Sequence, residues 1–322
     1  MYNKIIRDSQ YIYELKIFLE NNYDIQIESI DEAKRGFFGE TWKIATTKGK
    51  YFAKIDYSIP HKHIYINSFD IIEHLNNNGI KHICKILKTK ENTLYTIFRS
   101  GVMGIFDYVE GENTENYEIS RLFEKLAPIY KISAPNIKIK KEDFSVGCID
   151  SYYENLKNLK QNATGLILKE VVSYLGNNDE IVKHKANRLT MFADRCRSDK
   201  SNYYITHGDA GGNSIINGDN FTIIDWDFPM LSPIERDAWF FMTNNQNIKM
   251  INDILLANEI RYKLNNDRLA YYCYHSFFYY MYEYLSCYFE IEDNVSEDIA
   301  KGILGFFDCW IKKPIEIADG YS

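Results

Sequence analysis

Two short segments in the second half of the chain contain residues that could transfer a phosphoryl group. The first reads THGDAGGN (residues 206–213) and the second reads IDWD (residues 224–227). A carboxylate such as Asp209 can accept the proton of an alcohol while a phosphate ester forms. Asn213 and Asp225 offer oxygen ligands to Mg²⁺, which needs only one or two carboxylates when phosphate oxygens and waters complete its shell. The two segments therefore predict a small-molecule kinase.

The same residues also allow a purely structural interpretation. In that case the turn at residues 217–220 simply joins two strands, and Asp209 and Asp225 cap neighbouring turns. The His-Gly-Asp tripeptide taken alone favours neither interpretation. An aspartate, an asparagine, a hairpin and a second acidic cluster in this order favour the chemical one.

The hydrophobic pattern predicts the elements that position these residues. Helices are expected at residues 4–20, 64–76, 117–130, 148–159, 166–174 and 179–196, and again from 236 to the end. Strands are expected within residues 25–55, with a hairpin turn at 47–50, and at residues 94–98, 104–109, 203–206, 214–216 and 222–224. A hinge at residues 111–114 would separate a β-rich nucleotide-binding domain (1–110) from a larger, mainly helical catalytic and acceptor-binding domain (111–322), which is an α+β fold.

Composition narrows the class of partner. The 322 residues are 45% hydrophobic and 26% charged, as in ordinary globular proteins. A net charge of −7 argues against nucleic acid as the main partner and suits a cationic substrate. The six cysteines form no CxxC pair, so we expect reduced thiols in a cytoplasmic protein. No run of 18 apolar residues predicts a membrane span, and a monomer and a dimer are both compatible with the sequence.

The run HGDAGGN, followed by TIIDWD and PIERDAWFF, resembles the aminoglycoside phosphotransferase and choline kinase family. That family shares a bilobal, protein-kinase-like fold. The resemblance follows the order of segments along nearly the whole chain, and its specific residues lie between 206 and 240. It implies Asp209 as the catalytic base, Asn213 and Asp225 as Mg²⁺ ligands, and supporting positions for His207, Asp227 and Asp237.

The loop after the aspartate departs from the common family pattern. Many members place the asparagine five residues after the aspartate, whereas Asn213 stands four after Asp209 and Ser214 occupies the fifth position. Gly211 and Gly212 could absorb the shortening because glycine tolerates unusual backbone angles.

The N-terminal part resembles the nucleotide side of a kinase-like fold, which implies binding of ATP or GTP. Gly36 and Gly39 lie where such a fold has its phosphate-covering loop, although a plain hairpin turn fits them equally. Lys54 resembles the lysine that contacts nucleotide phosphates, against the alternative of a surface lysine on a strand. Tyr108 and Val109 resemble the segment whose backbone holds a purine, although any strand would look the same.

The family's lysine pairs with a carboxylate on the next helix, and the sequence offers no clear candidate. The inward face of the helix at 64–76 contains Ser68, whereas Asp70 and Glu73 point away from it. The pairing of Lys54 therefore stays open at this point.

Two other groups of residues have plainer interpretations. His61, His63, His82 and Cys84 fit no common zinc spacing, and the His-Lys-His run is expected to lie in a loop. The stretch from Tyr271 to Tyr288 is expected to be a core helix, with Glu283 as a weaker candidate for contacting a cationic substrate.

The expected reaction is O-phosphorylation of a small hydroxylated, amine-bearing molecule such as an aminoglycoside or a spectinomycin-like antibiotic. Residues 106–113 resemble the spectinomycin-directed branch of the family. A metabolic kinase for choline, homoserine or a sugar is the alternative within the enzyme class. A non-enzymatic relative, such as a spore-coat-type protein, is the alternative outside it.

Overall fold

The computed structural model describes residues 7–33, 39–57, 59–113, 118–134, 137–162, 166–199, 202–290 and 294–321. The predicted phosphate-loop residue Gly36 lies outside them. The chain packs into two compact units, which we name the sheet unit (residues 2–140 and 204–231) and the helical unit (residues 141–203 and 232–322). The predicted division into residues 1–110 and 111–322 stays a prediction.

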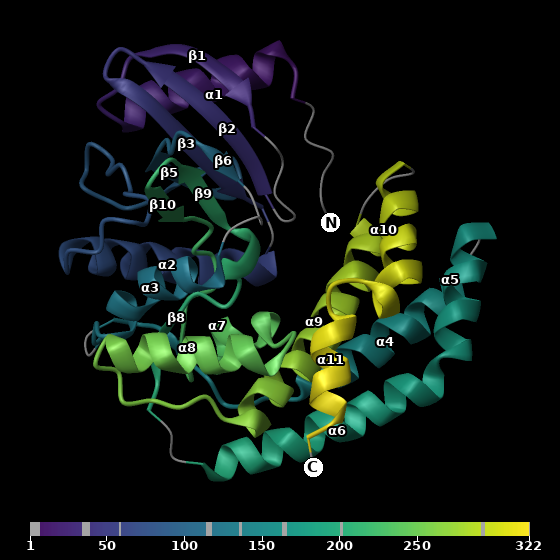
Figure 1. Cartoon of the computed structure of the whole chain (residues 1–322). Helices are drawn as coiled ribbons and strands as arrows, with labels where there is room; N and C mark the ends of the chain where they lie inside the picture. Colours follow the sequence, from purple (N-terminus) through teal and green to yellow (C-terminus); the bar gives the residue numbers. More distant parts are fainter. Residues whose placement is uncertain are drawn as a thin grey trace. The chain divides into compact units, whose positions relative to one another are not determined.

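The sheet unit is built on a five-stranded antiparallel sheet (Figure 1). Its strand order is β1-β2-β3-β5-β4, with β1 (Ile27–Glu32), β2 (Gly39–Thr46), β3 (Gly49–Asp56), β4 (Thr96–Phe98) and β5 (Gly101–Asp107). The predicted hairpin is confirmed: Thr46 pairs with Gly49 across a two-residue turn. Alternating side chains of β2 and β3, including Trp42 and Ile55, are fully buried.

Two helices cover parts of this sheet. Helix α1 (Ser9–Asn22) begins at Asp8, whose side chain accepts a hydrogen bond from the Tyr11 N–H, and it packs against β1 and β4. Helix α2 (Ile59–Asn77) packs against β3 and β5. The expectation of a loop at His61–His63 is wrong, since these residues lie in the first turns of α2. Pro60 suits the first turn of a helix because its fixed φ is already helical and its missing N–H would have no partner there.

The rest of the sheet unit consists of short elements. They are β6 (Glu112–Asn113), α3 (Ile119–Tyr130), β8 (Tyr204–Thr206), the single 3₁₀ turn η1 (Ala210–Gly212), β9 (Ser214–Asn217) and β10 (Asn220–Ile223). Strands β10, β9 and β6 form a second sheet, and the predicted turn between β9 and β10 is confirmed. The chain passes between the two units within β7 (Lys140–Lys141), between Tyr203 and Tyr204, and within β11 (Met230–Ser232). The sequence pattern missed the short strands β7 and β11.

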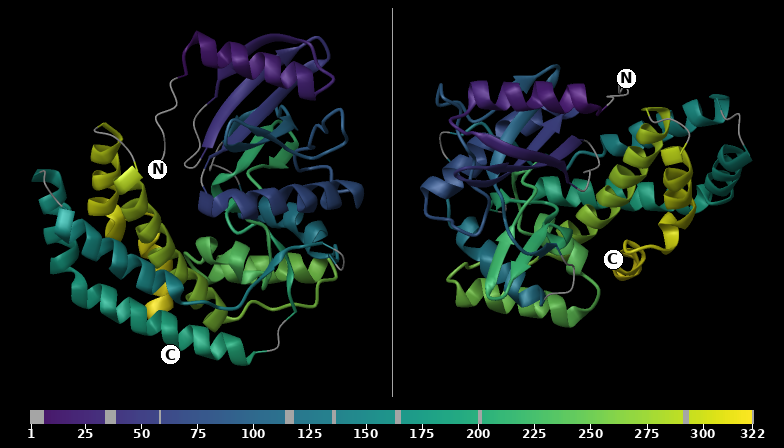
Figure 2. Two further views of the ribbon diagram at one scale, coloured as in Figure 1. Left: turned by 180° about the vertical axis from the view of Figure 1, so that it is seen from behind. Right: turned by 90° about the horizontal axis from the view of Figure 1, so that it is seen from above.

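The helical unit is organised around one long, apolar helix. Its elements are α4 (Gly147–Asn162), α5 (Leu166–Asn177), α6 (Asp179–Ser198), α7 (Glu235–Ala238), η2 (Trp239–Phe241), α8 (Asn245–Ala257), α9 (Asn266–Glu290), α10 (Asn294–Gly305), η3 (Phe306–Asp308) and α11 (Lys312–Asp319). Helices α4, α6 and α9 run side by side, as Figures 1 and 2 show. Tyr274, Phe277 and Met281 of α9 are fully buried, which confirms the predicted core helix.

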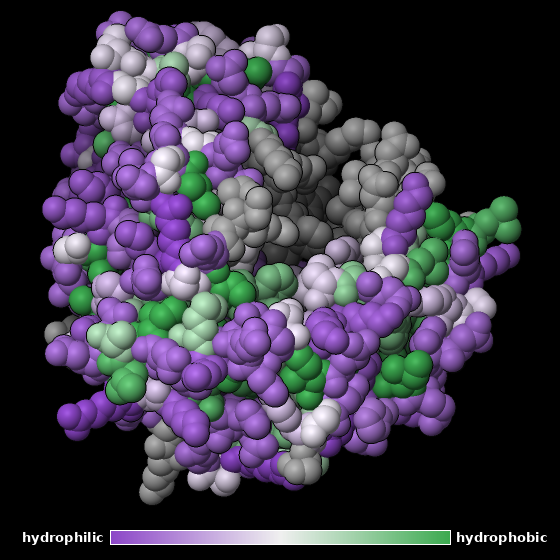
Figure 3. Space-filling model, viewed as in Figure 1, coloured by the Kyte–Doolittle hydropathy of each residue, from purple (hydrophilic) through white to green (hydrophobic). Residues whose placement is uncertain are grey.

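One face of the protein surface is mainly polar, as expected for the composition of the chain. On the face drawn in Figure 3, hydrophilic residues predominate and hydrophobic ones form small groups. Among the described residues, no helix is both long and apolar enough to cross a membrane.

Candidate active site

The THGDAGGN segment connects β8 to β9 through a loop that exposes Asp209. Gly208 has a φ of 88°, a left-handed backbone conformation that glycine adopts without steric cost. The chain then makes the single turn η1 and enters β9 at Ser214. Asp209 is exposed at the start of this turn, so it is accessible from solvent.

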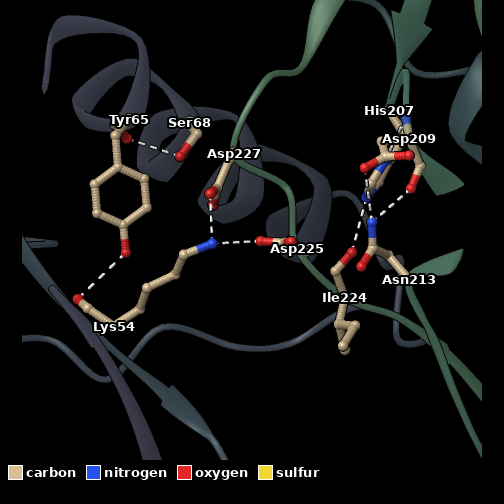
Figure 4. A network of polar contacts seen from close by, with 9 residues as sticks. All are labelled: Lys54, Tyr65, Ser68, His207, Asp209, Asn213, Ile224, Asp225 and Asp227. Atoms are coloured by element: carbon tan, nitrogen blue, oxygen red, sulfur yellow. Dashed lines mark hydrogen bonds and ion pairs between the residues drawn. The ribbon is translucent and has the colours of Figure 1, made fainter. Parts of the chain in front are cut away.

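His207 is buried beneath this loop and connects it to the second acidic segment (Figure 4). Its Nδ1 accepts the backbone N–H of Asp209 at 3.1 Å, and its Nε2 lies 2.8 Å from the carbonyl oxygen of Ile224. A carbonyl can only accept, so the proton is on Nε2 and the ring is the neutral Nε2–H tautomer. The ring also contacts Trp226 edge to face, with 4.6 Å between centroids. His207 therefore holds the backbone of Asp209 against the segment that carries Asp225.

Asn213 faces Asp209 across the shortened loop. Its Nδ2 donates to the Asp209 backbone oxygen at 2.7 Å and to the Asp209 carboxylate at 3.1 Å. Its backbone oxygen accepts the N–H of Ile224 at 2.9 Å. Because Nδ2 is committed to Asp209, the amide oxygen of Asn213 is the atom left for a cation. Ser214, the alternative in the family's usual register, instead points into the interior, where its Oγ is fully buried.

Asp225 and Asp227 follow β10 and meet Lys54, which lies on β3. The Lys54 ammonium donates to the carboxylates of both Asp225 and Asp227. The Lys54 side chain is 12% exposed and that of Asp227 17%, whereas the Asp225 side chain is 40% exposed. Asp225 is thus the carboxylate of this pair that a metal ion could reach from solvent. The structure brings Lys54 together with two of the predicted acidic residues.

Asp225 also has an unusual backbone conformation. Its φ is 62°, in the left-handed region that side chains with a Cβ rarely adopt, although aspartate tolerates it better than most. A turn held in this conformation directs the Asp225 carboxylate toward Lys54 immediately after the apolar strand ends.

The three charges shift one another's pKa values. Burial alone would lower the pKa of Lys54, but the Asp227 and Asp225 carboxylates outweigh it and raise that pKa above the ordinary lysine value. Burial, and next the charge of Asp225, raise the pKa of Asp227 to about 7. Burial opposes ionisation of Asp225 as well, but attraction to the Lys54 ammonium holds its pKa below the ordinary range. Asp225 is therefore the carboxylate that stays ionised at neutral pH.

The helix carboxylate that the family resemblance implies for Lys54 is not found among the described partners of this lysine. In α2, Glu73 forms an ion pair with Lys88 at 2.6 Å and Asp70 is exposed. The α2 residue next to Lys54 is Tyr65, whose hydroxyl donates to the Lys54 backbone oxygen at 3.4 Å. Tyr65 was not predicted, because a carboxylate was expected at this place on the helix. Its spacing of three residues from Ser68, already assigned to the inward face, was the available signal.

The oxygen atoms that Asp225 and Asn213 offer are chemically suited to Mg²⁺. Among the residues that the structure describes, no group of three or more His, Cys, Asp or Glu side chains could hold a metal by itself. Asp225 and Asn213 supply one carboxylate oxygen and one amide oxygen, which are hard ligands suited to a cation that takes its remaining ligands from phosphate and water. The Nε2 of His82, one of the residues considered for zinc, bonds the Lys125 carbonyl at 2.7 Å.

The remaining predicted nucleotide residues lie at two places in the sheet unit. A Cβ on Gly39 would stand 2.7 Å from the Ile55 backbone oxygen, so glycine is required there by the close approach of β2 and β3. Tyr108 follows β5, and its N–H donates to the Lys50 carbonyl at 3.2 Å. That bond commits the N–H of Tyr108 to the sheet, which leaves its carbonyl and the backbone of Val109 for the predicted purine contact.

Asp237 belongs to the helical unit. It is buried in α7, where it is one of two acidic residues in the first turn, as the sequence predicts. Its supporting role in the site stays a prediction.

Comparison with solved structures identifies the fold of the chain. No family model matches the sequence, and no curated protein matches it. The crystal structure of spectinomycin phosphotransferase APH(9)-Ia with ADP and spectinomycin matches with a TM-score of 0.79 and 20% identity, over 98% of this chain and 99% of that chain.

Two other small-molecule kinases match over similar lengths. The microcompartment-associated aminopropanol kinase matches with a TM-score of 0.63 and 12% identity, over 97% of both chains. Amicoumacin kinase hAmiN in complex with AMP-PNP, Ca²⁺ and Ami matches with a TM-score of 0.58 and 15% identity, over 93% of this chain and 94% of that chain. The chain has the protein-kinase-like fold of these small-molecule phosphotransferases.

Proposed function

We propose that this protein is a Mg²⁺-dependent phosphotransferase that moves the γ-phosphoryl group of ATP or GTP to a hydroxyl of a small molecule. The observation that carries the proposal is the convergence of two polar groups in the sheet unit. One is Asp209 with Asn213, and the other is Lys54 with Asp225 and Asp227. They are linked by the bonds of His207 and Asn213 to Ile224.

Asp209 is the proposed base. In the reaction, the acceptor oxygen forms a bond to the γ-phosphorus while the bond from that phosphorus to the β,γ-bridging oxygen breaks. The acceptor hydroxyl proton passes to the Asp209 carboxylate, and the nucleoside diphosphate leaves. Asp209 is suited to this because it is exposed, while its backbone N–H is fixed by His207 and its carboxylate is oriented by Asn213.

Asp225 and Asn213 are the proposed metal-binding side chains. When bound, Mg²⁺ would neutralise charge on the nucleotide phosphates. Asp225 supplies a carboxylate that stays ionised and is partly open to solvent. Asn213 supplies the amide oxygen that its bond to Asp209 leaves available.

Lys54 is the proposed phosphate ligand. Its ammonium is already held by two carboxylates, so it needs only to exchange part of that contact for a phosphate oxygen. The backbone around Val109 is the proposed contact for the purine of the nucleotide. The segment at Gly39 is the proposed contact for its phosphates.

For the acceptor, we propose a cyclic, amine-bearing polyol of the aminocyclitol or aminoglycoside type. The match to the spectinomycin phosphotransferase, with a TM-score of 0.79, supports this choice over aminopropanol, whose kinase matches at 0.63. The net charge of −7 is compatible with a cationic acceptor.

A nucleotide-consumption screen tests the proposal. The purified protein with Mg²⁺ and ATP or GTP is offered spectinomycin, several aminoglycosides, choline, homoserine and amino sugars, and release of diphosphate is measured. We expect consumption that depends on an aminocyclitol or aminoglycoside and yields a phosphorylated product by mass spectrometry. The matched control is Asp209→Asn, which keeps the shape of the side chain and should lower turnover by roughly 100-fold or more. Nucleotide binding without turnover of any acceptor would instead support a non-enzymatic role.

A further inference from the structure

Lys54 has a third neighbour besides its two carboxylates. The ammonium lies 5.9 Å from the centre of the Tyr65 ring, and the Tyr65 hydroxyl donates to the backbone oxygen of the same lysine at 3.4 Å. Tyr65 is 2% exposed, so this contact is shielded from water. An ammonium near an aromatic ring is attracted by the electron-rich face of that ring, and more strongly when both are desolvated.

The position of the Tyr65 ring is determined by packing on the strand beside Lys54. Lys54 pairs across β3 and β5 with Gly104, and the Phe69 ring lies against that glycine. A Cβ on Gly104 would stand 2.2 Å from Phe69, so the ring occupies the space that a side chain would need. Phe69 in turn packs on Tyr65 with 4.8 Å between centroids and stacks on Phe106.

The backbone of α2 adds a further constraint. Ser68 is buried, and its Oγ donates to the Tyr65 backbone oxygen at 2.7 Å. This local bond occupies the serine hydroxyl within the helix. The Tyr65 ring itself is held beside Lys54 by its packing on Phe69 and by the hydrogen bond of its hydroxyl to the Lys54 backbone oxygen.

We propose that Tyr65 is a positioning residue for Lys54. Together with Asp227, Tyr65 keeps the Lys54 ammonium in place when the Asp225 carboxylate turns to a metal ion. The inference rests on the proposed function, in which Lys54 binds a nucleotide phosphate and Asp225 binds the metal. A divalent cation on Asp225 competes with Lys54 for the same carboxylate. Asp227 and Tyr65 are the contacts that Lys54 retains through this exchange.

A double-mutant cycle tests the inference, because it separates action through Lys54 from a general packing role. The variants are Tyr65→Phe, Tyr65→Leu, Lys54→Met and the double variant Tyr65→Leu with Lys54→Met. Dissociation constants for Mg²⁺-ATP, and KM and kcat where an acceptor is known, are measured for each. Phe98→Leu is the control for losing a buried ring of the sheet unit, since Phe98 packs on Tyr11 and Phe18 instead of Lys54.

We expect Tyr65→Phe, which keeps the ring, to stay within about twofold of the wild type. Tyr65→Leu should weaken nucleotide binding about tenfold, as expected for a shielded cation–π contact. In the Lys54→Met background the same leucine should change binding less than twofold. Phe98→Leu should lower the melting temperature without changing nucleotide affinity.

Equal effects of Tyr65→Leu with and without Lys54 would overturn the inference, because the ring would then act only through packing. Should Tyr65→Leu fail to fold, the Tyr65 ring can be replaced with that of pentafluorophenylalanine, which keeps the shape but reverses the charge of the ring face. If the pentafluorophenylalanine variant bound Mg²⁺-ATP as tightly as Tyr65→Phe does, the inference would also be overturned. If Lys54→Met and Asp225→Asn themselves leave Mg²⁺-ATP binding intact, the proposed function fails instead.

Discussion

The Asn213 side chain donates to both the backbone oxygen and the carboxylate of Asp209, at 2.7 and 3.1 Å. This double contact spans a loop in which only three residues separate the two side chains. The single turn η1 makes this contact possible, because it brings Asn213 back over Asp209. A shortened loop therefore still places an asparagine against the proposed base.

The first prediction concerns which residue of this loop acts as the metal ligand. Asn213→Ala should lower kcat/KM by roughly 100-fold, since it removes an oxygen ligand and the donor that orients Asp209. It should also raise the Mg²⁺ concentration needed for half-maximal activity. Steady-state kinetics at varied Mg²⁺ would measure both effects.

Ser214→Ala is the matched control in the adjacent position. Ser214 Oγ is buried and has no hydrogen-bond partner among the residues that the structure describes, so losing the hydroxyl should leave activity unchanged and stability equal or slightly higher. If the Ser214→Ala variant lost activity and the Asn213→Ala variant kept it, the metal ligand would be Ser214, which stands five residues after Asp209 as the asparagine does in many family members.

The local parts of this site could be predicted from the sequence, and the partners of Lys54 could not. Asp209 and Asp225 follow short strands that the period-two pattern identifies, and Asn213 directly precedes one, so their positions depend on near neighbours. The contacts of Lys54 join residues 171 and 173 positions apart. The spacing of α2 places Asp70 and Glu73 away from the inward face and Tyr65 on the same side as Ser68, but it does not show which side chain approaches Lys54. Such contacts are set by how the helix packs on β3 and β5, which a single sequence does not reveal.

The second prediction uses the left-handed backbone of Asp225. Asp225→Gly and Asp225→Ala both remove the carboxylate, so both should abolish metal-dependent turnover. Glycine accepts a φ of 62° without strain, whereas alanine does not. The glycine variant should therefore be more stable than the alanine variant by about 1 kcal/mol. Urea denaturation of the two variants in EDTA would measure the difference, and equal stabilities would show that the turn relaxes to another conformation.

The third prediction concerns His207. His207→Phe keeps a ring against Trp226 but removes the acceptor for the Asp209 N–H and the donor to Ile224. Leaving these partly buried groups unpaired should cost about 1–3 kcal/mol of stability. We expect kcat to fall about tenfold with little change in nucleotide affinity, because the loop of Asp209 loosens while Lys54 is untouched. Calorimetry and kinetics on the same preparation would separate the two effects. A variant that lost nucleotide affinity but kept kcat would contradict this role.

The fourth prediction is a pH dependence that isolates Asp227. The pKa of Asp227 is raised to about 7, so the metal-free native state holds a proton on this carboxyl at pH values where the unfolded chain has released it. Stability from this group is therefore present at low pH and is lost as pH rises through about 7. In Asp227→Asn the side chain is neutral throughout, so this loss disappears. Melting temperatures in EDTA between pH 5 and 8 should show the wild type falling relative to the variant up to about pH 7 and running parallel to it above. Parallel curves over the whole range would mean that the Lys54 ammonium keeps Asp227 ionised. Asp225 and Asp227 would then both be negatively charged at neutral pH when no metal is bound.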